Sequence, residues 1–192
     1  MAFDIPTFSE NISTYGLSFS SKFDVQIIMP PIFSTLSQSD YPYIQQFNKI
    51  QPFRAKAVST PGAGFLTNET HPQGIGYRIK QVYNAGFPDI RMTFLGDAGG
   101  VIENFFTLWM NVVYNYSFSA GSSATFYTNY RSQVVSPNII INKYDRQKNI
   151  ISTYNITNAL PTLFISPVLD WENQNALNYF TAGFHYTSYT IL

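Results

Sequence analysis

Side chains that could do chemistry are few and scattered in this sequence. The two histidines, His71 and His185, do not stand at metal-ligand spacing with Asp, Cys or each other. The glycine-containing segments 62–64 and 97–100 lack the G-x-G-x-x-G and P-loop patterns that bind phosphate. No serine lies in a G-x-S-x-G motif, and the nearest acidic pair, Asp170-Trp171-Glu172, is typical of a strand end that enters a turn. The sequence therefore predicts no catalytic residue, no metal site and no cofactor, and we interpret the protein as a non-enzyme.

The composition indicates a protein whose faces are covered by other protein. Only 11% of the 192 residues are charged and 17% are aromatic, whereas ordinary soluble domains carry about 25% charged residues. The formal net charge is zero, so no basic footprint argues for direct nucleic-acid binding, and little repulsion opposes association. The most apolar stretch, residues 105–113, is too short to span a bilayer, and we expect no stable membrane insertion. We therefore expect the chain to associate with copies of itself or with partners.

One amphipathic helix is predicted from Ala98 to about Tyr114. Six apolar residues recur at i, i+3, i+4, i+7, i+10 and i+11, a spacing that places them on one helix face. They are Ile102, Phe105, Phe106, Trp109, Val112 and Val113. Asp97 is predicted as the N-cap, where it would accept a hydrogen bond from a backbone N–H two or three residues on. We interpret the helix as a core element that closes one side of a curved sheet.

Most of the remaining chain alternates apolar and polar residues in short runs, which predicts strands. The predicted strands cover residues 22–27, 53–58, 77–82, 89–95, 138–144, 150–156 and 180–191. The strands 138–144 and 150–156 are predicted to form a hairpin, which Asn158-Ala159-Leu160-Pro161 closes. Asn84-Ala85-Gly86 is predicted to end the strand before it.

A single domain is predicted over residues 21–192, preceded by an N-terminal arm at 1–20. Neither a repeat nor a shift in composition marks a second domain. Loop excursions are predicted near 34–52, which includes a short helical turn, and near 60–76 and 117–135. The excursions at 34–52 and 117–135 are expected to decorate the outside of the domain.

The excursion at 60–76 is the candidate for contact with a neighbouring subunit. Its prolines and glycines favour the tip of a long hairpin formed by 53–58 and 77–82, and two apolar residues offer anchors. The predicted contact residues are Pro61, Gly62, Phe65, Leu66, Pro72 and Gly74. A plain solvated loop is the alternative interpretation.

The order of the predicted elements is itself informative. The first half of the chain has a strand followed by proline (Phe23 to Pro30), a strand from Phe53 that ends at Pro61-Gly62, and Gly76-Tyr77-Arg78 before a further strand. The strand Asp89-Ile90-Arg91-Met92-Thr93-Phe94 comes next, followed by a helix with Phe105-Phe106-x-x-Trp109. The chain then continues with the Ile139–Asn155 hairpin, Asn158-Ala159-Leu160-Pro161 and an alternating aromatic strand. Over roughly residues 20–192, this order resembles the tail tube protein family of contractile-tailed bacteriophages.

This resemblance implies a mainly β fold, an antiparallel β-sandwich or barrel-like domain flanked by one amphipathic helix. It implies that six copies form a ring, that rings stack into the inner tail tube, and that DNA passes through the tube as a transient, non-specific cargo. The implied partners are copies of the chain and the tail sheath, tape measure and baseplate proteins. The implied location is the virion, after synthesis in the bacterial host cytoplasm.

Two other functions stay open from the sequence. Baseplate tube-initiator proteins share the fold, as do type VI secretion tubes, and an initiator would form one ring rather than a polymer. A carbohydrate-binding β-sandwich module is the alternative from another class, suggested by the many tyrosines and by Trp109 and Trp171. That function requires exposed aromatic platforms, whereas Trp109 is predicted to be buried on the apolar helix face.

Overall fold

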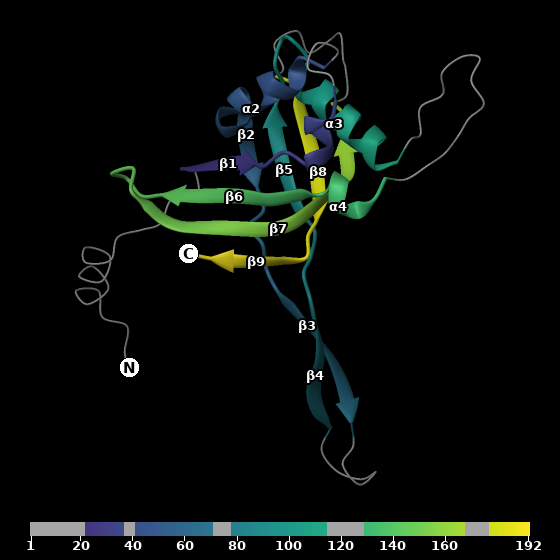
Figure 1. Ribbon diagram of the computed structural model, residues 1–192. Helices are drawn as coiled ribbons and strands as arrows, with labels where there is room; N and C mark the ends of the chain where they lie inside the picture. The colour runs from purple at the N-terminus through teal and green to yellow at the C-terminus, as the bar shows by residue number, and fades with distance from the viewer. Residues whose placement is uncertain (1–21, 37–40, 71–77, 115–128, 168–176) are drawn as a thin grey trace.

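The structure is a computed structural model that describes residues 22–36, 41–70, 78–114, 129–167 and 177–192. Figure 1 shows two crossing layers of strands with helices on one side. The strands are β1 (Phe23–Ile27), β2 (Ala55–Val58), β3 (Gly64–Thr70), β4 (Ile79–Gly86), β5 (Ile90–Leu95), β6 (Ser136–Tyr144), β7 (Ile150–Ile165), β8 (Tyr179–His185) and β9 (Ser188–Ile191). The helices are the 3-10 helix η1 (Pro31–Ser34) and the α-helices α2 (Tyr43–Arg54), α3 (Val101–Val113) and α4 (Arg131–Val134). The predicted mainly β, antiparallel fold is confirmed, whereas the predicted arm at 1–20 lies outside the described residues.

The body is one seven-stranded sheet that is bent into two layers. The strand order is β1-β6-β7-β8-β5-β2, and β9 also pairs with β7. The first layer contains β1, β6, β9 and residues 150–159 of β7, and the second contains β2, β5, β8 and residues 160–165 of β7. All of these pairs are antiparallel. The two layers therefore form the barrel-like body that the helices close.

Strand β7 makes the corner between the two layers. Asn158 has φ 54°, a left-handed conformation that Asn tolerates better than most residues. The chain turns there and then continues as a strand to Ile165. The predicted end of the hairpin at residues 158–161 is confirmed, since β7 pairs with β6 only as far as Ala159. The strand itself does not end there, because from Leu160 onward it pairs with β8. The predicted final strand 180–191 is divided at Tyr186 and Thr187. Strand β8 pairs with β5 and with residues 160–165 of β7, whereas β9 pairs with residues 154–157 of β7 in the other layer.

Helix α3 supplies the centre of the core. Ile102, Phe105, Phe106 and Trp109 are completely buried, and Val112 and Val113 are half-buried against the same cluster. The Trp109 indole Nε1–H donates a hydrogen bond to the Val134 carbonyl oxygen at 2.8 Å. Val134 lies in the excursion predicted at 117–135, of which residues 117–128 are outside the described residues. Helix α3 thus covers the concave side of the sheet and is tied to the segment that follows it.

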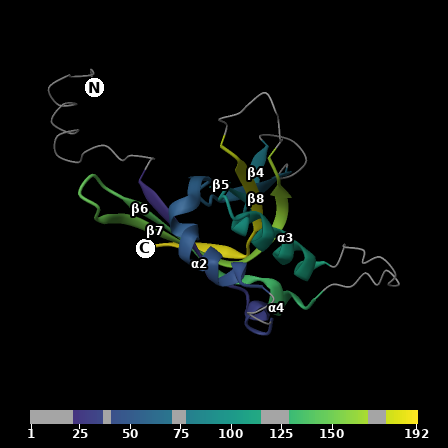
Figure 2. The same ribbon diagram turned by 90° about the horizontal axis from the view of Figure 1, so that it is seen from above.

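Helix α2 is a second flanking helix, where a loop excursion with a short helical turn is predicted. It also includes residues 53 and 54, so strand β2 begins at Ala55 rather than at residue 53. Figures 1 and 2 show α2 beside α3 over the same side of the sheet, and the Phe47 ring stacks on the Phe105 ring at 3.8 Å between centroids. The sequence of α2 has weak apolar periodicity and contains Pro52, which disfavours a helix. Tertiary contacts, rather than propensity, therefore hold α2 in place.

Gln51 of α2 is the main polar contact between this helix and the sheet. Its side chain is 2% exposed. Its Oε1 accepts a hydrogen bond from the Ile27 backbone N–H at 2.9 Å, and its Nε2 donates to the Ile27 carbonyl oxygen at 3.2 Å. Gln51 therefore satisfies backbone groups at the outer edge of β1 as a further strand would.

Replacing Gln51 by leucine is expected to lower the free energy of unfolding by about 1–3 kcal/mol, because the N–H and C=O of Ile27 would lose their buried partners. Urea denaturation followed by circular dichroism measures this loss. The matched control is Gln46→Leu on the exposed side of α2, which should change the stability by at most about 0.5 kcal/mol. Equal effects of the two substitutions would show that the Gln51 contacts do not stabilise the fold.

The start of α3 lies at Val101 rather than at Ala98. The N-cap is Gly100, with a left-handed φ of 66°. Asp97 precedes the helix and caps its first turn. Its carboxylate accepts hydrogen bonds from the backbone N–H groups of Val101 at 2.9 Å and Ile102 at 3.1 Å. The predicted capping group is thus the right one, but its partners lie four and five residues on because the chain turns at residues 98–100.

Replacing Asp97 by alanine is expected to cost about 1 kcal/mol of stability at neutral pH. Burial acts to raise the pKa of Asp97, but the hydrogen bonds from Val101 and Ile102 outweigh it and hold the pKa below its ordinary value. The carboxylate therefore stabilises the fold above the unfolded-state pKa of about 3.9, and this contribution is lost as the pH falls through the lower pKa of the folded protein.

Denaturation at neutral pH and near pH 2.5 should show the wild-type advantage over Asp97→Ala shrinking with acidity. Thr107→Ala, an exposed substitution on the same helix, is the control and should not change the pH dependence. A cost of Asp97→Ala that is the same at both pH values would contradict this account of the helix start.

Candidate assembly surface

A hairpin of β3 and β4 projects from the body and forms a two-stranded sheet of its own. Figure 1 shows it extending away from both layers, on the connection between β2 and β5. A projecting hairpin is expected from the sequence, but the strands that form it differ from the predicted ones. The predicted loop 60–76 contains β3, and β4 continues through residues 84–86, where a break is predicted. The pairing is therefore between 64–70 and 79–86 rather than between 53–58 and 77–82.

The six residues predicted to contact a neighbouring subunit fall into three groups. Pro61 is buried at the root of the hairpin, and the Gly62 carbonyl accepts a hydrogen bond from the Tyr186 hydroxyl at 3.2 Å. Phe65 and Leu66 are exposed on β3. Pro72 and Gly74 lie outside the described residues. The root thus joins the hairpin to the body, and the exposed apolar side chains begin at Phe65.

Large apolar side chains are exposed on both strands of the hairpin. The exposed fractions are 68% for Phe65, 48% for Leu66, 46% for Ile79, 58% for Val82 and 67% for Tyr83. Ile79, Val82 and Tyr83 are not identified from the sequence, because alternation over 77–82 indicates a strand half-buried in the body. A two-stranded ribbon is marginally stable alone, and an exposed apolar patch of this kind marks an interaction surface.

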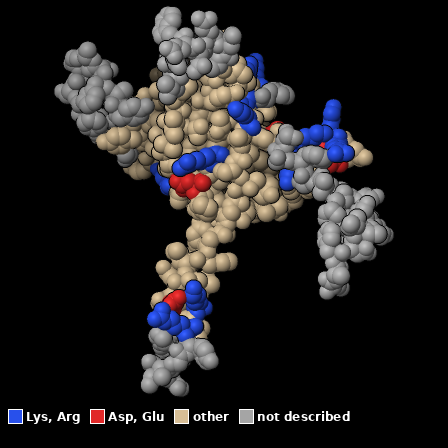
Figure 3. All heavy atoms as spheres, turned by 180° about the vertical axis from the view of Figure 1, so that it is seen from behind, with Lys and Arg blue, Asp and Glu red and all other residues tan. Residues whose placement is uncertain are grey.

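Charged side chains gather at the far end of the hairpin. The Glu69 carboxylate lies 3.2 Å from the Arg78 guanidinium and 3.4 Å from the Lys80 ammonium. Figure 3 shows this charged end separated from the body by uncharged surface. Exposed ion pairs of this kind add about 0–1 kcal/mol each to stability. Their position suits the orientation of a partner more than the stability of the hairpin.

Strand β9 has an open edge, as far as the described residues show. Its inner side pairs with β7, and Leu192 beyond it exchanges backbone hydrogen bonds with Thr153 at 2.9 and 3.0 Å. Because backbone groups alternate along an antiparallel strand, the N–H and C=O of Tyr189 and Ile191 point away from β7. Neither a charge nor a proline protects this strand, and such edges pair with other chains. The edge of β1 differs, since Gln51 occupies its backbone groups at Ile27.

The residues considered for chemistry do not come together in the described part of the chain. His185 Nδ1 lies 2.9 Å from Asp89 Oδ1, and both side chains are about half exposed. His71 and residues 170–172 are outside the described residues. The described residues contain no group of three His, Cys, Asp or Glu that could hold a metal ion. In the same residues, every helix is too short or too polar to cross a membrane.

Comparison with known proteins gives a match over nearly the whole chain. A family model described as phage tail tube protein matches residues 18–192. No curated protein matches the chain in sequence.

Solved structures with a similar fold come from contractile injection systems. A chain of the sheath–tube complex of an extracellular contractile injection system, PVC, in the extended state has a TM-score of 0.59 at 14% identity, over 100% of this chain and 99% of that one. A chain of the anti-feeding prophage baseplate has a TM-score of 0.58 at 12% identity, over 92% and 95% of the two chains. A chain of the cap that terminates the anti-feeding prophage tube has a TM-score of 0.58 at 16% identity, over 92% and 91%. At these identities, the similarity shows a shared fold.

Proposed function

Because the chain belongs to the phage tail tube protein family, we propose that it forms hexameric rings that stack into the inner tube of a contractile tail, through which DNA passes during injection. Members of this family are structural components of a phage tail or a related particle. The family match over residues 18–192 is the observation that carries the proposal. The chain then acts through its contacts with other subunits and not through a catalytic site.

Two surfaces of the described structure support assembly from identical copies. The hairpin presents exposed apolar side chains away from the body, and β9 presents an open strand edge. These surfaces differ from each other, as head-to-tail contacts in a ring require. We propose that the hairpin contacts a neighbouring copy and that the edge of β9 pairs with a strand of another copy as the ring closes.

The proposed partners beyond copies of the chain are the tail sheath, the tape measure protein and the baseplate. The structures of similar fold include a sheath–tube complex and a baseplate, which supports sheath and baseplate contacts for this chain. DNA is proposed as a transient and non-specific cargo. We place the protein in the virion, after its synthesis in the host cytoplasm.

A baseplate tube-initiator ring is the second candidate function, favoured by the similar fold of the anti-feeding prophage baseplate chain. The carbohydrate-binding module is disfavoured, because Trp109 is completely buried and cannot serve as an exposed platform.

Negative-stain imaging and sedimentation of the purified protein test the proposal. We expect rings at low concentration and stacked tubes at high concentration. Single rings that do not stack at any concentration would favour the initiator. A monomer that forms neither rings nor tubes at high concentration would contradict both functions.

A further inference from the structure

The hairpin joins the body through two short linkers. No strand of the body pairs with β3 or β4 in the described structure, so the direction of the hairpin depends on what the linkers contact. The first linker, residues 60–63, follows Ser59, whose backbone N–H still donates to the Arg91 carbonyl oxygen of β5 at 2.9 Å. The second linker, residues 87–89, leads directly into β5. A ribbon held by two linkers alone would swing as a unit, because few buried contacts would oppose the motion.

Tyr186 contacts both linkers. It follows β8, and its side chain is 2% exposed. Its hydroxyl donates a hydrogen bond to the carbonyl oxygen of Gly62 in the first linker at 3.2 Å. Its ring lies 5.9 Å, between centroids, from the ring of Phe87 in the second linker. One buried side chain of the body therefore holds both linkers at the same point.

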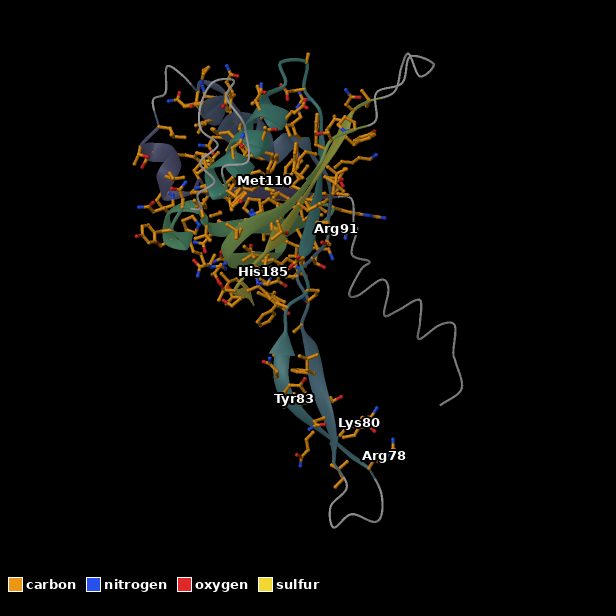
Figure 4. The ribbon with its side chains drawn as sticks, turned by 90° about the vertical axis from the view of Figure 1, so that its right-hand side faces the viewer. Arg78, Lys80, Tyr83, Arg91, Met110 and His185 are labelled. Carbon is orange, nitrogen blue, oxygen red and sulfur yellow. The ribbon has the colours of Figure 1, made fainter. Side chains whose placement is uncertain are left out.

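Two residues close to Tyr186 in the sequence also contact the second linker. The Tyr189 ring in β9 lies 5.9 Å from the Phe87 ring and 6.3 Å from the Tyr186 ring, and aromatic pairs at such separations are favourable beyond their burial. His185 Nδ1 lies 2.9 Å from Asp89 Oδ1. Figure 4 shows His185 at the end of the body from which the hairpin extends. The segment 185–189 thus surrounds the base of the hairpin with contacts.

We propose that Tyr186 is a positioning residue, which fixes the direction of the hairpin relative to the body before the subunit meets another copy. The consequence for assembly rests on the proposed tube function, whereas the fixed direction is a property of the single subunit. A binding element that is already held in one direction loses less conformational entropy on association. Tyr186 thus lowers the concentration at which copies assemble, although its own side chain is buried inside the subunit.

Conservative substitutions separate the hydroxyl of Tyr186 from its ring. Tyr186→Phe removes the hydrogen bond to Gly62 and keeps the buried ring, while Phe87→Leu keeps an apolar side chain and removes the ring contacts of the second linker. The matched control is Tyr144→Phe in β6, because the Tyr144 hydroxyl also donates a hydrogen bond, to Asp24 Oδ2 at 2.8 Å, outside the linkers. This control shows what the loss of one hydroxyl hydrogen bond does to the subunit in general.

The direction of the hairpin is measured as a distance distribution in unassembled protein. The chain has no cysteine, so Thr67→Cys on β3 and Thr107→Cys on α3 place two spin labels at exposed positions, and double electron–electron resonance gives the distance between them. We expect a narrow distribution for the labelled wild type and for Tyr144→Phe, and a roughly twofold or greater width for Tyr186→Phe and Phe87→Leu. A wide distribution in the labelled wild type, or an unchanged width in Tyr186→Phe, would overturn the positioning role.

Tube formation by the unlabelled proteins tests the consequence for assembly. Tyr186→Phe is expected to need a roughly three- to tenfold higher concentration to form tubes, measured by pelleting and negative-stain imaging, whereas Tyr144→Phe should assemble like the wild type. Normal assembly of Tyr186→Phe despite a widened distribution would overturn the effect on assembly and leave the tube function intact. Failure of the wild type to form rings or tubes would overturn the tube function, and the distance measurement would still decide the positioning role.

Discussion

Replacing Trp109 by alanine is expected to lower the free energy of unfolding by about 3–5 kcal/mol. The side chain is completely buried, and its ring contacts Phe33, Phe105, Phe106 and Phe184. The substitution would leave a cavity among these rings and would remove the donor to the Val134 carbonyl. Domains of this size are stable by about 5–15 kcal/mol, so the variant should lie near the limit of folding. Urea denaturation of unassembled protein, followed by far-ultraviolet circular dichroism, measures the loss.

Two further substitutions divide this effect into its parts. Trp109→Phe keeps most of the packing but removes the N–H donor, and it should cost less than the alanine substitution. Tyr130→Ala changes an aromatic residue that is 81% exposed and should alter the stability by at most about 0.5 kcal/mol. A loss in Trp109→Ala as small as that in Tyr130→Ala would contradict the central role assigned to α3.

Replacing Ile191 by proline is expected to abolish tube formation while the subunit stays folded. The backbone N–H of Ile191 points away from β7, so proline removes a donor from the open edge without breaking the pairing of β9 with β7. The Ile191 side chain is more than half exposed, so little core packing is lost. Imaging and pelleting should show subunits without tubes, and the circular dichroism spectrum should match that of the wild type.

The control for the open edge is Ile191→Val, which keeps the N–H donor and a β-branched side chain and should assemble normally. Thr190→Pro is the opposite case. The backbone N–H of Thr190 points toward β7, where Thr190 pairs with Asn155. Proline at this position would remove that donor from the β7–β9 pairing and should destabilise the subunit itself. Normal tubes from Ile191→Pro would show that the edge of β9 does not pair with another copy.

Local patterns predict the parts of this fold whose neighbours are close in sequence. The apolar periodicity of Ile102 to Val113 predicts α3, and the alternation of Ile90, Met92 and Phe94 predicts β5 with these residues inward. The hairpin of β6 and β7 follows from two apolar runs around a short polar turn. In each case, the residues that face the core are visible as a period of 3.6 or 2.

The parts that differ from prediction depend on distant contacts. Helix α2 is held by the stacking of Phe47 on Phe105 and by the hydrogen bonds of Gln51 with the backbone of Ile27. Neither contact produces a periodic pattern of apolar residues in the sequence. In the sequence, the bend of β7 at Asn158 resembles a turn that ends a strand, because a single strand seldom pairs in two sheet layers.

The sequence predicts where the candidate assembly surface lies, but it identifies only some of the residues that form it. Phe65 and Leu66 are found because they stand alone among polar residues, whereas Ile79 and Val82 alternate as in a buried strand. Alternation shows which residues share a face, but it does not show whether that face meets the core of the same chain or another molecule.

The bent sheet has a mechanical consequence. Where two sheets are held together by side-chain packing alone, a sideways force can slide one past the other. Here the backbone of β7 crosses from one layer to the other, and the connection from β8 to β9 crosses back. In the proposed assembly, a thrust along its axis would therefore be carried between the two layers of each subunit by covalent bonds as well as by side-chain packing.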